Sequence, residues 1–311
     1  MILVCGEALI DIFVGAETHD SMNLLGCPGG SPFNVAFGLA RLGQQAEFFT
    51  GLSRDMMGQR LYRFLRAEQV GERYLKRSGR PSTLSLVDLT GPTPAYAFYG
   101  DGAADRDLTL AELPALADEV LALHFGSFST VVEPVGTTYL ALAQREAGRR
   151  IISYDPNIRM SIEPDINVWH GRVDAFAACA DLIKISDEDF ERLYPGLDPA
   201  TKAREWLLGG AGLVVLTRGG AGACAWTKDA AVEVPAPVID VIDTVGAGDT
   251  FQAALLTALA ETGHLQRQRL STISHEAMHT CIAFAIEAAA ITCTRRGADL
   301  PHRRDLPQLR A

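Results

Sequence analysis

The chain has 311 residues, of which 48% are hydrophobic and 21% charged, a balance typical of a globular protein that buries its core in one large domain or two smaller ones. Its net charge of -10 argues against nucleic acid or an anionic membrane surface as the main partner. No uninterrupted apolar run reaches membrane-spanning length, the N-terminal residues lack the basic region of a signal peptide, and the six cysteines include no Cys-x-x-Cys pair, so we expect a cytoplasmic protein with reduced thiols.

The first predicted element is a strand at residues 2–5, a continuous apolar run that ends at Gly6 and suits a position buried on both faces of a sheet. Asp11 follows where a strand of an α/β sheet is expected to end, which is the edge at which such sheets bind ligands. A carboxylate in a turn or at a helix cap explains Asp11 equally well on its own.

A glycine-rich turn precedes the first predicted helix. Ser31 is a good N-cap and Pro32 a good first helical residue, so the helix is expected to begin there. Gly29 and Gly30 allow the backbone to approach a ligand closely, and Asn34 in the first turn can both donate and accept hydrogen bonds. These residues suit a polyhydroxylated ligand. The alternative is a plain Gly-Gly loop before a capped helix.

Two segments lack helical periodicity and are expected to form a small antiparallel β-sheet flap. They span about residues 12–31 and 82–105, and the second contains strand-like runs at 83–89 and 95–99 around the turn Thr90-Gly91-Pro92-Thr93-Pro94. A strand at residues 46–50 and a helix at residues 58–68 are expected between them. We expect both insertions to form a lid on a single α/β domain that spans residues 1–311.

From residue 124 onward, short apolar strands alternate with helices. The strands are expected at residues 124–127, 151–154, 182–185 and 212–217, and the helices at 133–147, 168–178 and 201–208. This alternation predicts a mostly parallel sheet flanked by helices. Residues suited to ligand binding follow three of the strands: Asp155, Asn157 and Arg159; Ser186 and Asp189; Thr217, Gly219 and Gly222. Any one group could be a cap or a turn, but neighbouring parallel strands end at one edge, so we expect a shared cleft.

The segment Asp243-Thr244-Val245-Gly246-Ala247-Gly248-Asp249 is a glycine-rich turn that leads directly into an amphipathic helix. Amide groups at a helix start lack intrahelical partners and lie at the positive end of the dipole, so Gly246, Ala247 and Gly248 are expected to hold a phosphate. A carboxylate there would repel the phosphate unless it faces the attacking hydroxyl, so we interpret Asp249 as a catalytic base. The alternative is a tight loop in which Asp249 only stabilises the helix dipole. The segment is neither a Walker A loop nor a good dinucleotide fingerprint.

The segment His275-Glu276-Ala277-Met278-His279 matches the zinc-protease pattern His-Glu-x-x-His. Two histidines four positions apart share a helix face, but a zinc site needs a third protein ligand. Glu287 is the nearby candidate, and it lies two turns further along the same helix, where it cannot close a tetrahedral site. We interpret the match as chance and expect no zinc.

These motifs together resemble those of the ribokinase-like, or PfkB, family of sugar kinases. Gly29-Gly30-x-x-x-Asn34 is similar to the N-terminal signature of the family, and residues 243–249 are similar to its C-terminal signature. Residues 6–11, 155–159 and 294–298 look most like bacterial fructokinases. The resemblance covers nearly the whole chain. It implies a Rossmann-like, mostly parallel sheet flanked by helices, with a β-sheet lid that also forms a dimer interface.

The resemblance also implies a role for each matched residue. It implies sugar contacts at Asp11, Gly29, Gly30 and Asn34, a base at Asp249, and an anion hole at Gly246, Ala247 and Gly248. It implies nucleotide contacts at Thr217, Gly219 and Gly222, and positions near the phosphates and Mg²⁺ for Asp155, Asn157 and Arg159. Backbone carbonyls of Asp243, Val245 and Gly297 match the potassium loop of the family.

The chain departs from the family pattern at three places. Ser186-x-x-Asp189 stands where the family often has Asn-x-x-Glu, which bears on the water-mediated contact between Asp189 and Mg²⁺. Phe284 stands where an asparagine is common beside the adenine, and Gly100 where an arginine is common in the lid strand of related enzymes. These departures concern the nucleotide contacts and the choice of sugar, and leave the reaction type unchanged.

We therefore expect an ATP-dependent kinase with Mg²⁺ and K⁺ as cofactors and O6 of fructose as the acceptor. The alternatives are a 2-keto-3-deoxygluconate kinase, a nicotinamide-dependent oxidoreductase and a non-catalytic sugar-binding regulator. Residues 12–31 and 82–105 contain no lysine or arginine to bind a sugar acid, whereas Phe98 and Tyr99 can pack on a neutral sugar ring. The apolar lid strands also predict a homodimer through the lid.

Overall fold

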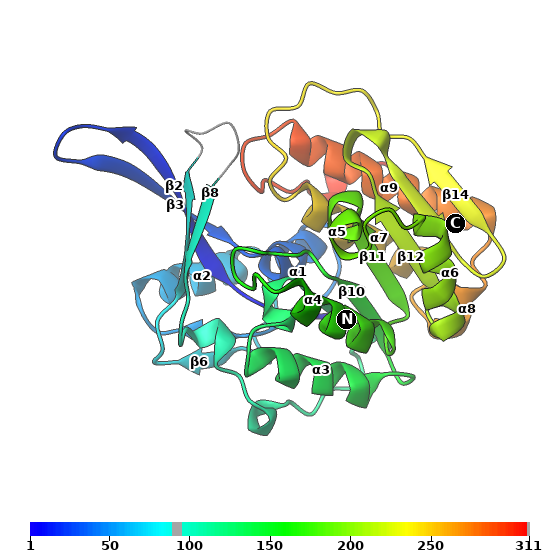
Figure 1. The fold of residues 1–311 in the computed structure, drawn as a ribbon, viewed down its shortest axis with the longest axis horizontal. Coiled ribbons are helices and arrows are strands. Elements are labelled where there is room, and N and C mark those ends of the chain that lie inside the picture. Colours follow the sequence, from blue (N-terminus) through cyan, green and yellow to red (C-terminus); the bar gives the residue numbers. More distant parts are fainter. Residues whose placement is uncertain (89–94, 310–311) are drawn as a thin grey trace.

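The computed structural model describes residues 1–88 and 95–309 and contains a large sheet, a protruding four-stranded sheet and a small two-stranded sheet (Figure 1). The small sheet pairs β5 (Gly51–Ser53) with β6 (Lys76–Ser78). The expected turn Thr90-Gly91-Pro92-Thr93-Pro94 lies outside the described residues.

The large sheet has the strand order β14-β13-β12-β11-β10-β9-β1-β4. The strands from β12 to β4 run parallel, and β13 and β14 continue one edge with antiparallel pairs. The mostly parallel sheet expected from the sequence is confirmed, and the β13–β14 hairpin is an addition. The strands are β1 (Ile2–Cys5), β4 (Ala46–Phe49), β9 (Ala122–Gly126), β10 (Ile151–Asp155), β11 (Leu182–Ser186), β12 (Leu213–Thr217), β13 (Ala223–Trp226) and β14 (Ala231–Val234).

Helices cover both faces of this sheet because alternate residues of its strands point to opposite sides. In β1, Ile2 and Val4 pack into one hydrophobic core, and Leu3 and Cys5 pack into the other. The first core contains α1 (Ser31–Arg41), α2 (Met56–Ala67), α7 (Ala247–Glu261), α8 (Arg267–Ser271) and α9 (His275–Cys293). The second contains α3 (Val135–Glu146), α4 (Ile166–Ala177), α5 (Asp187–Leu193) and α6 (Pro199–Gly209).

The helix α9 is long and apolar enough to cross a membrane when judged by length and composition alone. In the structure it packs against α7 and β14, and Met278, Ile282 and Ala285 on it are buried in the first core. Its apolar composition is therefore explained by packing between the other elements of the domain.

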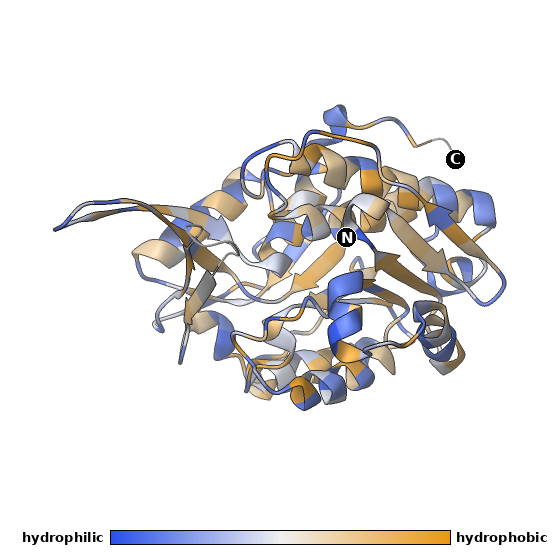
Figure 2. Cartoon of the chain, turned by 45° about the horizontal axis from the view of Figure 1, so that its top comes forward, coloured by the Kyte–Doolittle hydropathy of each residue, from blue (hydrophilic) through white to orange (hydrophobic). Residues whose placement is uncertain are grey.

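The protruding sheet has the order β3-β2-β7-β8 and extends away from the body (Figure 2). Its strands are β2 (Leu9–Glu17), β3 (Met22–Gly29), β7 (Thr83–Asp88) and β8 (Ala95–Tyr99). The pairs β2–β3 and β7–β8 are antiparallel, but β2 and β7 run parallel. The fully antiparallel flap expected from the sequence is wrong in this respect, because β2 and β7 each begin at the body and run outward.

The strand order changes direction at β1. The chain first adds β4 on one side of β1 and then crosses over to place β9 on the other side. Such a switch point leaves a crevice outside the carboxyl ends of the two strands, where α/β proteins bind ligands. Glu7 follows β1 and Ser127 follows β9, and the protruding sheet begins two residues after Glu7.

Candidate active site

The N-terminus of α7 is built to leave backbone amides free. Its N-cap is Gly246, whose φ of 79° is a left-handed conformation that favours glycine, and a Cβ atom there would lie 2.8 Å from Ala298. Among the described residues, no side chain caps this helix end, so the first amides can bind an anion. The Ala247 amide donates to the Thr244 carbonyl at 3.2 Å, so Gly246 and Gly248 are the better phosphate ligands.

Asp249 is buried in the first turn of α7 and is held by two residues of α1. Ser31 Oγ donates to one carboxylate oxygen at 2.6 Å, and Asn34 Nδ2 donates to the other at 2.8 Å. Gly30 is the N-cap of α1 and Ser31 its first residue. The N-cap expected at Ser31 is therefore wrong, because its hydroxyl binds Asp249 instead of a helix amide.

The surroundings of Asp249 shift the pKa of its carboxyl in opposite directions. Burial raises the pKa of its carboxyl above the ordinary aspartate range. The hydrogen bonds from Ser31 and Asn34, and the positive charges of Arg159 and Lys184, act in the opposite direction. All four groups favour the ionised carboxylate, which is the form that can accept a proton.

Asp11 lies beside the two glycines that precede α1. Its carboxylate fills the space of a Cβ atom at Gly29, which would be 2.1 Å away, and Gly30 has a φ of 107° with a backbone carbonyl 3.0 Å from its own Cβ position. Gly30 therefore requires glycine, and a side chain at Gly29 would displace the Asp11 carboxylate. Burial raises the pKa of Asp11 to about 6, and the charge of Arg159 opposes this rise. The charge of Arg159 thus lowers the pKa of both Asp11 and Asp249, which indicates that the three side chains lie near one another.

The protruding sheet brings Phe98 into the same neighbourhood. Asp11 on β2 pairs with Ser85 on β7, and Ser85 pairs with Phe98 on β8, so the three side chains lie in one row on one face. The half-buried ring of Phe98 packs edge-on against Phe128, with 5.9 Å between ring centroids. Phe128 lies just beyond β9, at the switch point of the large sheet.

A buried ion pair lies next to the start of α7. Lys184 Nζ binds Asp155 Oδ2 at 2.8 Å, and the same Nζ lies 3.4 Å from the position of a Cβ atom at Gly248. Asp155 was expected at this edge, whereas Lys184 was not recognised from the sequence. Its signal was a single lysine inside the apolar strand Leu182–Ser186, since a charge in a strand buried on both faces needs a partner.

The carboxylates of Asp189 and Asp155 at this edge differ in their hydrogen-bond partners. Ser186 Oγ accepts from the Asp189 amide at 3.1 Å, and the Asp189 carboxylate accepts from the Ile158 amide at 3.2 Å and from Arg192 at 3.0 Å. Asp155 Oδ1 is buried and has no partner among the described residues. Carboxylates that reach Mg²⁺ through water need a free oxygen, so Asp155 fits that task better than Asp189.

The expected nucleotide contacts lie after β10 and β12. Asn157 has a φ of 42°, which is uncommon outside glycine and turns the chain away from β10. Thr217 ends β12 half-buried, and Gly219 is exposed with open space at its Cβ position. A Cβ atom at Gly222 would lie 2.0 Å from the Val234 carbonyl, so packing against the end of β14 already requires this glycine.

Asp243 joins the two loops that were expected to hold K⁺. Its carboxylate accepts from the Val245 amide at 3.1 Å and from the Gly297 amide at 2.8 Å. The Gly297 carbonyl also accepts from the Asp299 amide at 2.8 Å and keeps a second lone pair. Backbone carbonyls of this kind replace the hydration shell of K⁺ in proteins, so the two loops fit such an ion.

Known proteins that are similar to this chain identify its family. Residues 1–304 match the family described as pfkB family carbohydrate kinases. The chain belongs to the pfkB family. It is 42% identical to a fructokinase of Rhizobium leguminosarum bv. trifolii over 278 residues, which cover 89% of this chain and 85% of that protein. It is 33% identical to a probable chloroplastic fructokinase-6 of Arabidopsis thaliana, covering 95% of this chain and 78% of that protein.

The solved structures give the same result for the fold of this pfkB kinase. The fructokinase from Xylella fastidiosa with bound ATP matches it with a TM-score of 0.87 and 27% identity, covering 99% of this chain and 95% of that one. The Rossmann-like fold expected from the sequence, with a mostly parallel sheet flanked by helices, is therefore confirmed.

Two sequence features of the pfkB kinase lie on α9. Phe284 is buried in α9, and the Arg303 guanidinium lies over its ring at 5.4 Å. His275 and His279 are exposed on the first turns of the same helix. Within residues 1–88 and 95–309, no three His, Cys, Asp or Glu side chains come together as a metal site would need.

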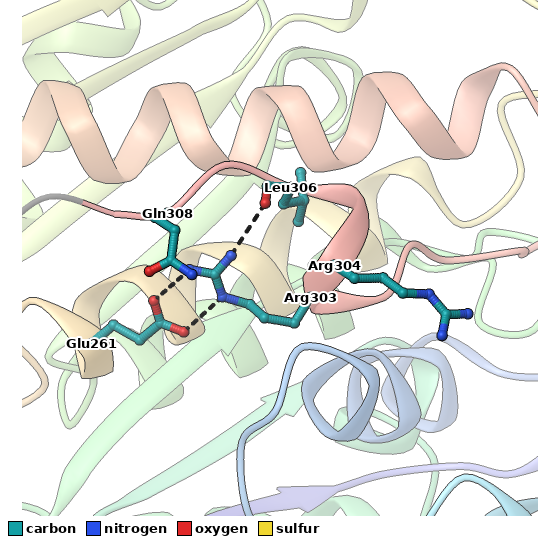
Figure 3. Close-up of a pocket in the computed structure, with 5 residues that line it drawn as sticks. All are labelled: Glu261, Arg303, Arg304, Leu306 and Gln308. Carbon is teal, nitrogen blue, oxygen red and sulfur yellow. Dashed lines mark hydrogen bonds and ion pairs between the residues drawn. The ribbon is translucent and has the colours of Figure 1, made fainter.

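A surface hollow near the C-terminus is lined by Glu261, Arg303, Arg304, Leu306 and Gln308 (Figure 3). The Arg303 guanidinium donates to both carboxylate oxygens of Glu261 at 3.0 Å and to the Leu306 carbonyl at 3.4 Å. These contacts fasten the C-terminal segment to the last residue of α7. The hollow is explained by this attachment and includes none of the candidate active-site residues.

Proposed function

We propose that this pfkB kinase transfers the γ-phosphoryl group of ATP to O6 of fructose and forms fructose 6-phosphate and ADP. The observation that carries the proposal is the buried carboxylate of Asp249, which accepts hydrogen bonds from Ser31 and Asn34 in the first turn of a helix with free amides. The curated relative at 42% identity is a fructokinase, which supports this choice of sugar.

In the proposed reaction, Asp249 accepts the proton of the O6 hydroxyl as the sugar oxygen bonds to the γ-phosphorus. The bond from the γ-phosphorus to the bridging oxygen breaks, and the electron pair leaves with ADP. Asp11, Gly29, Gly30, Asn34 and Phe98 would orient the sugar so that O6 faces Asp249. A positioned base of this kind contributes about 10²–10⁴-fold to a rate.

The negative charge of the transferring phosphoryl group needs donors on the same side of α7. The amides of Gly246 and Gly248 and the guanidinium of Arg159 would bind its oxygens. The ammonium of Lys184 lies beside Gly248 in the first turn of α7 and would add positive charge there. Thr217, Gly219 and Asn157 would contact the remainder of the nucleotide.

Two metal ions suit the residues present. The free Oδ1 of Asp155 would bind a water on Mg²⁺, and Asp189 would be a second carboxylate near the ion. When bound, Mg²⁺ would neutralise charge on the β- and γ-phosphates. The carbonyls of Asp243, Val245 and Gly297 would hold K⁺ beside the N-terminus of α7.

The protruding sheet would serve as the lid of the site and as a dimer interface. Met22, Leu24 and Leu25 on β3 and Tyr99 on β8 have relative exposures of 53% to 65%. A sheet with this much apolar surface is expected to be covered by a second copy of the chain. The composition and net charge fit a cytoplasmic enzyme.

A coupled assay of ADP release across a sugar panel tests this function. The panel contains fructose, glucose, ribose and 2-keto-3-deoxygluconate, and the phosphorylated position is determined by ³¹P NMR of the product. We expect the highest kcat/KM with fructose and phosphate on O6. A higher kcat/KM with 2-keto-3-deoxygluconate, or NADH binding without ADP release, would refute the proposal.

A further inference from the structure

One buried arginine at the base of the protruding sheet has two guanidinium nitrogens without a hydrogen-bond partner among the described residues. Arg106 ends a short 3₁₀ helix, η1 (Ala104–Arg106), and is only 8% exposed. Its Nε and Nη2 atoms are buried without a hydrogen-bond partner among the described residues, and its Nη1 lies 4.0 Å from the exposed Asp101. A buried guanidinium normally satisfies its donors, so these free N–H groups point to a ligand.

The guanidinium stands where a side chain at Gly100 would be. A Cβ atom at Gly100 would lie 2.4 Å from Nη2 of Arg106 and 2.6 Å from its Nε. Residue 100 and Arg106 therefore compete for one space at the end of β8. The lid segments at 12–31 and 82–105 contain no lysine or arginine, but Arg106 follows directly after the second segment and places a cation at the end of the sheet.

Arg106 and Phe98, a residue of the candidate sugar site, pack on the same aromatic ring. Its guanidinium carbon lies 5.0 Å from the ring centroid of Phe128, the residue on which Phe98 also packs. Phe128 follows β9 at the switch point of the large sheet, and Phe98 lies in the same row as Ser85 and Asp11. Arg106 thus reaches the end of the site that Phe98 and Phe128 form.

Other buried polar atoms around this crevice also lack partners among the described residues. They are Glu7 Oε2, Asn34 Oδ1, Ser85 Oγ and Asp105 Oδ2. Asp105 is also bound to the lid, since its Oδ1 accepts from Thr83 Oγ1 at 2.6 Å. A ligand with several hydroxyl groups can both donate to such acceptors and accept from the Arg106 guanidinium.

We propose that Arg106 is a specificity-determining residue of the sugar site, and that its Nε and Nη2 donate hydrogen bonds to hydroxyl oxygens of the bound ketohexose. The inference rests on the proposed function. Gly100 leaves room for this guanidinium, which a Cβ atom at that position would displace. The adjacent carboxylate of Asp105 offsets the positive charge of Arg106, so the pair suits a neutral sugar better than a sugar acid.

Two variants test the role of Arg106 from opposite sides. Arg106→Met keeps an apolar side chain of similar length over Phe128 and removes the hydrogen-bond donors. Gly100→Ala leaves the arginine in the sequence, but the added Cβ atom displaces its guanidinium. We expect KM and Kd for fructose to rise roughly tenfold to hundredfold in both variants, as loss of hydrogen bonds to a charged group predicts. KM for ATP and Tm should stay near the wild-type values. The control is Arg80→Met, since Arg80 is an exposed arginine paired with Asp107 near the same lid.

The outcomes separate this inference from the proposed function. Failure of the wild-type enzyme to release ADP with fructose would refute the function itself. Normal wild-type turnover with an unchanged fructose KM in both variants would overturn only the role of Arg106. If KM for fructose and KM for ATP changed equally and Tm fell, Arg106 would have a purely structural role. Loss of turnover with 2-keto-3-deoxygluconate but not with fructose in Arg106→Met would assign it to a carboxylate and also contradict the inference.

Discussion

Removal of the Ser31 hydroxyl should move the pH dependence of turnover. Ser31 Oγ donates to Asp249 at 2.6 Å, and this hydrogen bond is one of the contacts that lower the pKa of the buried carboxyl. Ser31→Ala removes that donor, so the pKa of Asp249 should rise and the base should lose its proton only at higher pH. A hydrogen bond to a charged group contributes about 1.5–3 kcal/mol, and one pKa unit corresponds to about 1.4 kcal/mol. The acid limb of the kcat profile should therefore move up by about one to two pH units.

The assay measures kcat from ADP release at saturating fructose and ATP, from mildly acidic to mildly alkaline pH. Ser31 is the first residue of α1, where alanine is well tolerated, so Tm should hardly change. The control is Thr257→Val, which removes a buried hydroxyl that has no partner among the described residues and lies on α7, the same helix as Asp249. An acid limb in Ser31→Ala that coincides with that of the wild type would refute the assignment of Asp249 as the titrating base.

Three further changes test the site and the lid. Burial raises the pKa of Glu7 from 4.5 to about 7. Its stabilising contribution is therefore complete below pH 4.5 and is lost as pH rises to 7. In urea unfolding, the free energy of unfolding of Glu7→Gln should be about 3 kcal/mol above that of the wild type at pH 8 and equal to it at pH 4. Lys184→Met leaves the Asp155 carboxylate buried without a cation, so unfolding should show a loss of about 3–5 kcal/mol, most of it restored by adding Asp155→Asn, while kcat stays low. Leu25→Asp should convert a dimer to a monomer in light scattering, whereas the same change at Leu208, which is also exposed but lies on α6, should not. A wild-type monomer would refute the dimer.

The sequence predicted the parts of this fold that depend on local pattern. Continuous apolar runs predicted the parallel strands, and the glycine-rich turn before α7 predicted free amides and a carboxylate beside them. The partners of that carboxylate could not be predicted, because Ser31 and Asn34 lie more than 200 positions from Asp249 and meet it only through the packing of α1 on α7.

Two residues show why the rest of the site was not predicted. Lys184 looks like an interruption in an apolar strand until its pairing with Asp155 is known. Arg106 lies just outside the expected lid segments, and only the fold places its guanidinium against Gly100. The parallel pairing of β2 with β7 was missed for the same reason, since strand direction depends on where each segment leaves the body.

The central claim is that Asp249 is the base of a fructose kinase, and Asp249→Asn tests it most directly. An asparagine can accept from Asn34 and donate to Ser31 Oγ, so the site should keep its shape and calorimetry should give a fructose Kd close to that of the wild type. We expect a kcat lower by about 10²–10⁴-fold with fructose binding preserved. A kcat close to that of the wild type would show that Asp249 is not the base.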